Sequence, residues 1–122
     1  MPIKKDETKP ERISTEKNRL NRIYRDVAKE QKDIAQGLII RAAFMRVTLE
    51  DMENDLDDKG FVELFSQSEK TEPYERERPV ARLYNTINKN YQSIIKQLTD
   101  LLPKVDANAE KDDGFDDFIA KR

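Results

Sequence analysis

Apolar residues recur every three or four positions between residues 79 and 102, and this spacing constrains the fold more than any other feature of the sequence. The stripe consists of Val80, Leu83, Tyr84, Ile87, Tyr91, Ile94, Ile95, Leu98, Leu101 and Leu102. Such spacing places the apolar side chains on one face of a helix, which must then be buried. Pro79 suits the first turn of a helix, and Pro103 cannot continue one. We therefore predict a helix from Pro79 to about Leu102.

A second segment with helical spacing covers residues 14–47. Its apolar positions are Leu20, Ile23, Tyr24, Val27, Ile34, Ala35, Leu38, Ile39, Ala42 and Met45. The stripe is thin between Val27 and Ile34. The segment therefore forms either one long helix or two helices with a bend near residues 29–33, and we favour two.

Residues 48–60 carry the signals of a short separate helix. Thr48, with Asp51 three residues later, has the pattern of a capping box. Gly60 is well placed to end this helix in a left-handed conformation. Residues 61–78 show no helical stripe and hold too few apolar residues for a strand of a large sheet, so we expect a short hairpin or an ordered loop.

Both ends of the chain are polar and charged. We predict a flexible leader over residues 1–13, with Ser14 or Thr15 as the helix cap, and a disordered acidic tail over residues 104–122. The helical domain then covers residues 14–103. The tail keeps three large apolar residues at helical spacing, which are Phe115, Phe118 and Ile119. Either they form a short segment that folds on a partner, or the tail is an ordinary ragged terminus.

These elements predict a mainly α fold, a small domain of three to four helices with a short hairpin or loop insertion. Charged residues make up 39% of the 122 residues and hydrophobic residues 36%, so the core is thin. A thin core suggests support from copies of the same chain or from another partner.

The composition also excludes most kinds of catalytic and metal site. The chain contains no histidine and no cysteine, which removes the usual general base, thiolate metal sites and the commonest nitrogen ligand of transition metals. The three glycines stand far apart, so the sequence has no glycine-rich phosphate loop. We therefore expect no enzymatic activity, no cofactor and no bound metal.

The sequence shows no segment that would address it to a membrane. No apolar run follows the basic residues near the N-terminus, so we expect no signal peptide. No stretch approaches the roughly 20 apolar residues that span a bilayer. The absence of cysteine fits a reducing compartment, and we expect a cytoplasmic protein with no membrane partner.

Charge is nearly balanced over the chain but uneven along it. Residues 14–47 carry eight basic and four acidic residues, whereas residues 48–60 carry one basic and six acidic residues. The candidate DNA-binding residues are Arg19, Arg22, Arg25, Lys29 and Lys32. The last four recur every three or four positions, so they would share one helix face that could lie along a phosphate backbone. Alternatively, this face is solvated and carries the ion pairs Arg22–Asp26 and Lys29–Asp33.

Two further features have a plain structural explanation. The acidic residues 50–58 lack the glycine and the spacing of a calcium loop, so we expect a solvated surface there. Tyr84 and Tyr91 lie two turns apart on one helix face. They could stack on bases, but we expect them at the rim of the core.

The chain resembles the phage terminase small-subunit family from about residue 20 to its end. The resemblance rests on three segments, RAAFMRVTLEDMENDL, RPVARLYNTINKNYQSIIKQLTDLLPK and DDGFDDFIAKR. Its most telling part is the proline-led helix with Tyr84-Asn85 and Ile94-Ile95-Lys96-Gln97-Leu98, which closes in Leu101-Leu102-Pro103. The chain departs from a typical DNA-binding protein because it lacks a helix-turn-helix with a glycine turn.

The resemblance implies a DNA-packaging adaptor that binds double-stranded viral DNA and assembles into a ring of identical subunits. It also implies that DNA is handed to a large subunit, which carries the ATPase and the nuclease. The basic early segment would face DNA, and the tail would contact the large subunit or the portal. The alternative is a phage accessory or regulatory protein that acts only through protein–protein contacts.

Overall fold

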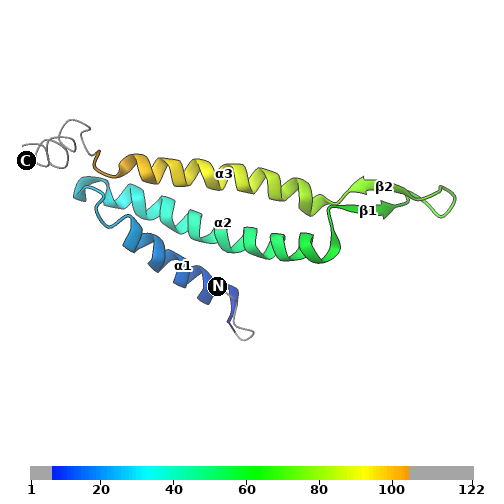
Figure 1. The fold of residues 1–122 in the computed structure, drawn as a ribbon, viewed down its shortest axis with the longest axis horizontal. Coiled ribbons are helices and arrows are strands. Elements are labelled where there is room, and N and C mark those ends of the chain that lie inside the picture. Colours follow the sequence, from blue (N-terminus) through cyan, green and yellow to red (C-terminus); the bar gives the residue numbers. More distant parts are fainter. Residues whose placement is uncertain (1–6, 105–122) are drawn as a thin grey trace, which may run out of the picture.

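The computed structural model describes residues 7–104, which form three helices and one β-hairpin (Figure 1). The elements in chain order are α1 (Lys9–Ile23), the 3-10 turn η1 (Lys29–Gln31), α2 (Lys32–Lys59), β1 (Val62–Phe65), β2 (Tyr74–Glu77) and α3 (Pro79–Leu101). Helix α2 lies between α1 and α3, and the hairpin projects beyond the end of the α2–α3 pair (Figure 1). The predicted mainly α fold is confirmed, and of the two forms expected for residues 61–78, a short hairpin or a loop, the structure has the hairpin.

The core forms where all three helices meet. Leu20, Ile39 and Leu98, one from each helix, are at most 2% exposed. Helix α2 contributes the small residues Ala35, Ala42 and Ala43 to the same cluster. Small side chains let neighbouring helices approach closely, so α2 can be covered by α1 and by α3 over the same few turns.

Helix α3 begins and ends where the sequence predicted. Pro79 is its first residue, and Leu102 follows its last residue as the C-cap, directly before Pro103. The stripe buries Ile94 and Leu98 in the core. Leu83 lies in the same stripe but is more than half exposed, because α1 does not reach this part of the α2–α3 pair (Figure 1).

Helix α1 begins earlier than predicted. Its N-cap is Thr8, whose Oγ1 accepts a hydrogen bond from the backbone N–H of Glu11 at 3.3 Å. The prediction that Ser14 or Thr15 caps this helix is therefore wrong, and residues 9–13 belong to the helix and not to a leader. Arg12 forms an ion pair with Asp51 of α2 at 2.6 Å and so ties this first part of α1 to the domain.

The early segment is divided into two helices, as favoured from the thin apolar stripe. Helix α1 ends at Ile23, and α2 begins at Lys32. The backbone N–H of Tyr24 closes α1 by donating to the carbonyl of Leu20 at 2.9 Å. Val27 is buried within the connection, so the chain is fixed to the core between the two helices.

Helix α2 runs without a break through the position where a new helix was predicted. The capping-box prediction at Thr48 is wrong, because Val47 and Leu49 on either side of it are buried in a helix that has already begun at Lys32. Gly60 ends α2, as predicted, and its N–H donates to the carbonyl of Leu56 at 2.8 Å. Its φ is +81°, but its ψ of −179° is extended and not left-handed helical, a combination that almost only glycine adopts.

The hairpin is antiparallel, and its register gives it two distinct faces. Val62 pairs with Glu77, Glu63 with Arg76, Leu64 with Glu75, and Phe65 with Tyr74. Residues directly opposite each other share a face and neighbours along a strand alternate, so one face carries Val62, Leu64, Glu75 and Glu77. In the connecting loop, Thr71 Oγ1 donates to the carbonyl of Ser68 at 3.0 Å and fixes the turn.

Candidate functional site

The candidate DNA-binding residues surround the connection between α1 and α2, at the end of the molecule opposite to the hairpin (Figure 1). Arg19 and Arg22 belong to α1, Arg25 follows its end, Lys29 belongs to η1, and Lys32 begins α2. The prediction that the last four share one helix face is wrong, because the chain leaves α1 after Ile23 and turns back. Whether they bind DNA stays a prediction.

Arg19 differs from the other four because it belongs to a polar network inside the fold. Its Nε and one terminal nitrogen donate to the two carboxylate oxygens of Glu16, both at 2.7 Å. Glu16 is only 9% exposed, and it also lies 3.6 Å from Nε of Arg46 on α2. Arg46 in turn donates to the hydroxyl of Tyr91 on α3 at 3.3 Å.

This network stabilises the charged form of Arg19 and of Arg46. The hydrogen bond to Glu16 is the largest influence that raises the pKa of Arg19, and the hydrogen bond to Tyr91 does the same for the pKa of Arg46. Both guanidinium groups are therefore engaged in joining α1, α2 and α3. We assign Arg19 a structural role, since its best donor nitrogens are already paired.

The remaining basic residues of the connection are more accessible. Arg22, Arg25 and Lys29 are exposed, and none of them forms an ion pair with another residue of the described range 7–104. The expected pairs Arg22–Asp26 and Lys29–Asp33 are thus absent within this range. Lys32 is half-buried, and its Nζ donates to the carbonyl of Arg25 at 2.5 Å, which ties the connection together.

The charge of this connection is only weakly positive. Four basic residues, from Arg22 to Lys32, stand among three acids, which are Asp26, Glu30 and Asp33. The N-terminus of α2 lies here as well, and its N-cap Gln31 makes no side-chain hydrogen bond to it. A helix N-terminus favours anions, so it adds to the positive potential of the exposed basic side chains.

The acidic residues 50–58 are not only a solvated surface, and that prediction needs correction. Asp51 and Glu50 lie 2.6 and 3.5 Å from the guanidinium of Arg12 on α1. Asp55 binds Arg78 at 2.7 Å, and Glu53 accepts a hydrogen bond from Tyr84 at 2.9 Å. The run therefore holds α1 on one side of α2 and the start of α3 on the other.

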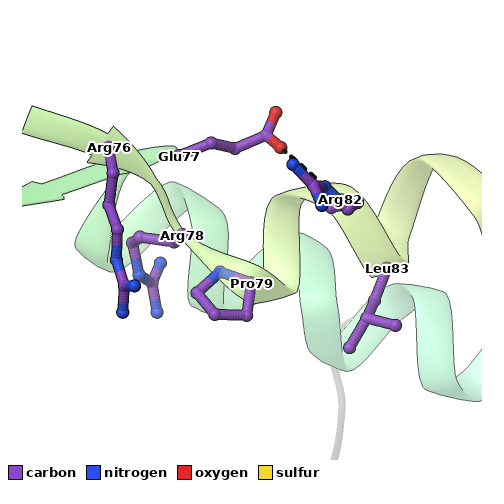
Figure 2. A pocket seen from close by; sticks show the side chains of 6 residues that line it. All are labelled: Arg76, Glu77, Arg78, Pro79, Arg82 and Leu83. Carbon is purple, nitrogen blue, oxygen red and sulfur yellow. Dashed lines mark ion pairs between the residues drawn. The ribbon is translucent and has the colours of Figure 1, made fainter.

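Residues 7–104 contain no candidate metal site. Within them, no group of three or more potential ligand side chains could hold a metal ion. A shallow cleft of about 440 Å³ lies at the base of the hairpin (Figure 2). Its lining residues are Arg76, Glu77, Arg78, Pro79, Arg82 and Leu83.

The arginines of this cleft already have partners. Arg76 binds Glu63 at 2.7 Å, and Arg78 donates to Asp55 and to the carbonyl of Gly60, both at 2.7 Å. Figure 2 shows Arg76 and Arg78 on one side of β2 and Glu77 on the other, where Glu77 lies 3.5 Å from Arg82. Arg76–Glu63 thus joins the two strands, whereas Arg78–Asp55 and Glu77–Arg82 hold the base of the hairpin to the helices.

Exposed apolar side chains form the feature that the sequence analysis missed. Within the described residues they are Ile23 of α1, Ile34, Ile40 and Phe44 of α2, Phe61, Val62, Leu64 and Tyr74 of the hairpin region, and Leu83 of α3. Ile34 was assigned to the apolar stripe, yet it is 63% exposed. The hairpin itself was one of the two forms expected for residues 61–78. The signal that could have revealed its exposed apolar face is the alternation of apolar and charged residues in Val62-Glu63-Leu64, on strands too few to form a layered sheet.

The two tyrosines of α3 lie at the rim of the core, as expected. Tyr91 packs against the core cluster and accepts the hydrogen bond from Arg46, while Tyr84 is half-buried beside Glu53. The tail residues Phe115, Phe118 and Ile119 lie outside the described residues.

No helix in the described part of the chain is both long enough and apolar enough to cross a bilayer. Searches against protein-family models, curated proteins and solved structures find no match to this chain.

Proposed function

We propose that this chain is a non-catalytic DNA-packaging adaptor, a terminase small subunit, that binds double-stranded DNA through the connection between α1 and α2. The observation that carries the proposal is the exposure of Arg22, Arg25 and Lys29 at one end of the molecule, with no ion pair to the rest of residues 7–104. Basic side chains that keep no internal partner can neutralise phosphates and release the counterions of DNA.

The weak net charge of this end supports an assembly of several copies. One copy offers a small basic surface interrupted by acids, and its affinity for DNA would be low. Several copies on one DNA molecule would bind far more tightly, because the effective concentration of each further site is high. In this proposal the assembled adaptor acts in the host cytoplasm and presents the DNA to the large ATPase and nuclease subunit, with Phe115, Phe118 and Ile119 as the contact for that subunit.

Salt-dependent binding to a DNA duplex tests the proposal. The test variant reverses the three exposed charges, Arg22→Glu, Arg25→Glu and Lys29→Glu. Lys32 is left in place because its hydrogen bond to Arg25 supports the connection. We expect this variant not to bind DNA even at low salt, where electrostatic binding is strongest. Variants that replace one basic residue by a neutral one should lower the slope of the salt dependence by about one for each phosphate contact removed.

A second variant with the same change in net charge serves as the control. It reverses the exposed Lys59, Lys70 and Lys89, which lie toward the hairpin or along α3. The control should bind DNA much as the native chain does. If both reversed variants bind DNA as tightly as the native chain, the connection is not the DNA site. If both lose the same affinity for DNA, binding responds to net charge alone.

A second candidate function is that of an accessory protein that acts only through protein–protein contacts. The exposed Val62 and Leu64 favour it, because apolar side chains on a projecting hairpin are suited to a protein partner. The same titration separates the two candidates. A native chain that shows no salt-dependent affinity for DNA would support the second candidate and refute the first.

A further inference from the structure

Two apolar surfaces remain uncovered at different places on the molecule. The first, the hairpin face, consists of Val62, Leu64, Glu75 and Glu77. The second, the α2 patch, consists of Ile34, Ile40, Arg41 and Phe44. All eight residues are exposed within the described part of the chain, and the two surfaces carry opposite charge.

The side chains on the opposite face of the hairpin contact one another. On that opposite face, Arg76 binds Glu63 at 2.7 Å and lies 3.4 Å above the ring of Phe65. Phe65 also meets Tyr74 edge to face, with ring centres 5.9 Å apart. Val62 and Leu64 point away from these contacts, and Leu64 is 73% exposed. An isolated two-stranded hairpin is marginally stable in water, so it gains from a cover on this face.

The α2 patch combines apolar and basic groups on one side of the helix. At about 100° per residue, residues 34, 40, 41 and 44 lie within about one third of its circumference. Arg41 is exposed, and its only hydrogen bond in the described residues is a long one of 3.4 Å to the carbonyl of Gly37. Lys9 lies 4.9 Å above the ring of Phe44 and adds a second positive charge.

We propose that the hairpin face of one copy docks on the α2 patch of a second copy. Val62 and Leu64 would cover Ile40 and Phe44. Glu75, which forms no ion pair within residues 7–104, would face Arg41, and Glu77, which also lies 3.5 Å from Arg82 of its own copy, would face Lys9. Opposite charges around an apolar centre favour this pairing over hairpin with hairpin or patch with patch, which would bring like charges together. The surfaces lie on different parts of an elongated molecule, with the hairpin beyond the end of α2 (Figure 1).

This contact is heterologous, and that has a consequence for assembly. Each copy that docks its hairpin face still offers its α2 patch, so further copies can add until a ring closes or a filament forms. A closed assembly repeats this contact and so gains further stability over a single pair. The inference deepens the proposed function, because it names the contact by which the adaptor would self-assemble.

The mass of the full-length chain in solution tests the contact, by light scattering or native mass spectrometry at high concentration. We expect the native chain to assemble and the single variants Leu64→Glu and Phe44→Glu to be monomers. Both positions are at least half exposed, so the fold tolerates the changes. The control Ile23→Glu alters a comparably exposed apolar residue outside both surfaces and should assemble like the native chain.

Mixing the two disrupted variants gives the sharpest result. Leu64→Glu keeps an intact α2 patch and Phe44→Glu keeps an intact hairpin face, so an equal mixture should form a one-to-one dimer and nothing larger. Complex formation in the mixture also shows that both variants are folded. The inference is overturned if the native chain is a monomer, if either variant assembles normally, or if the mixture stays monomeric.

The assembly test and the DNA-binding test can fail independently of each other. Salt-dependent DNA binding by a chain that assembles through other surfaces would refute this contact and leave the DNA-binding proposal standing. Dimer formation in the mixture together with no affinity for DNA would establish the contact and refute the DNA-binding proposal.

Discussion

The hydroxyl of Tyr24 lies 3.1 Å from the hydroxyl of Thr99, although 75 residues separate them in the sequence. Tyr24 caps the end of α1, and Thr99 belongs to the last turns of α3. The contact therefore fixes the connection between α1 and α2 against the end of α3. The exposed basic residues proposed to bind DNA are carried by this fixed connection.

Removal of the Tyr24 hydroxyl should lower the stability of the fold modestly. We expect Tyr24→Phe to lower the free energy of unfolding by about 1 kcal/mol, the usual net value of one hydrogen bond. Urea denaturation measures the change. In a double-mutant cycle with Thr99→Val, the second substitution should cost little once the first is present, and full additivity would show that the two hydroxyls do not interact.

Glu16→Gln should cost more, because Glu16 meets two arginines from different helices. The substitution removes the charge that lies 2.7 Å from Arg19 and 3.6 Å from Arg46, so it leaves two guanidinium groups poorly compensated. We expect a loss of about 1–3 kcal/mol in the free energy of unfolding. Glu11→Gln, at an exposed position of the same helix, should change it by less than about 0.5 kcal/mol. If Glu16→Gln and Glu11→Gln lower the stability equally in thermal unfolding, Glu16 has no special role.

Substitution by alanine should change the stability in opposite directions at Gly37, inside α2, and at Gly60, which ends it. Gly60 has a φ of +81°, so Gly60→Ala forces a side chain into a strained backbone and should cost about 1 kcal/mol or more. Gly37 lies inside α2, and a Cβ there would meet only Arg41 at an ordinary distance of 3.7 Å. Gly37→Ala should therefore stabilise the fold by up to about 1 kcal/mol. Melting temperatures that shift in the same direction would refute this assignment.

Tyr84 should ionise at higher pH than a free tyrosine. The hydrogen bond that it donates to Glu53 raises the pKa of its phenol, with smaller contributions from burial and from the negative charge. The neutral phenol is thus the favoured form, so its contribution to stability is present below the ordinary pKa and is lost as the pH rises through the raised one. Alkaline absorbance titration of the native chain and of Tyr84→Phe isolates this group, and Glu53→Gln should return its pKa toward the ordinary value.

The sequence alone determined the elements whose signals are local. Pro79 and Pro103 bound α3 correctly, and Gly60 marked the end of α2, because proline and glycine restrict or permit backbone angles wherever they stand. The thin stripe after Val27 likewise indicated the division of the early segment into two helices.

Only the tertiary structure decided the features that depend on distant partners. Thr48 has the pattern of a helix start but lies inside α2, since burial of its neighbours continues the helix. The start of α1 is held to α2 by the contact of Arg12 with Asp51, 39 residues away, which no local signal reveals. Ile34 matches the apolar spacing yet faces outward, because periodicity gives the faces of a helix but not which face a neighbour will cover.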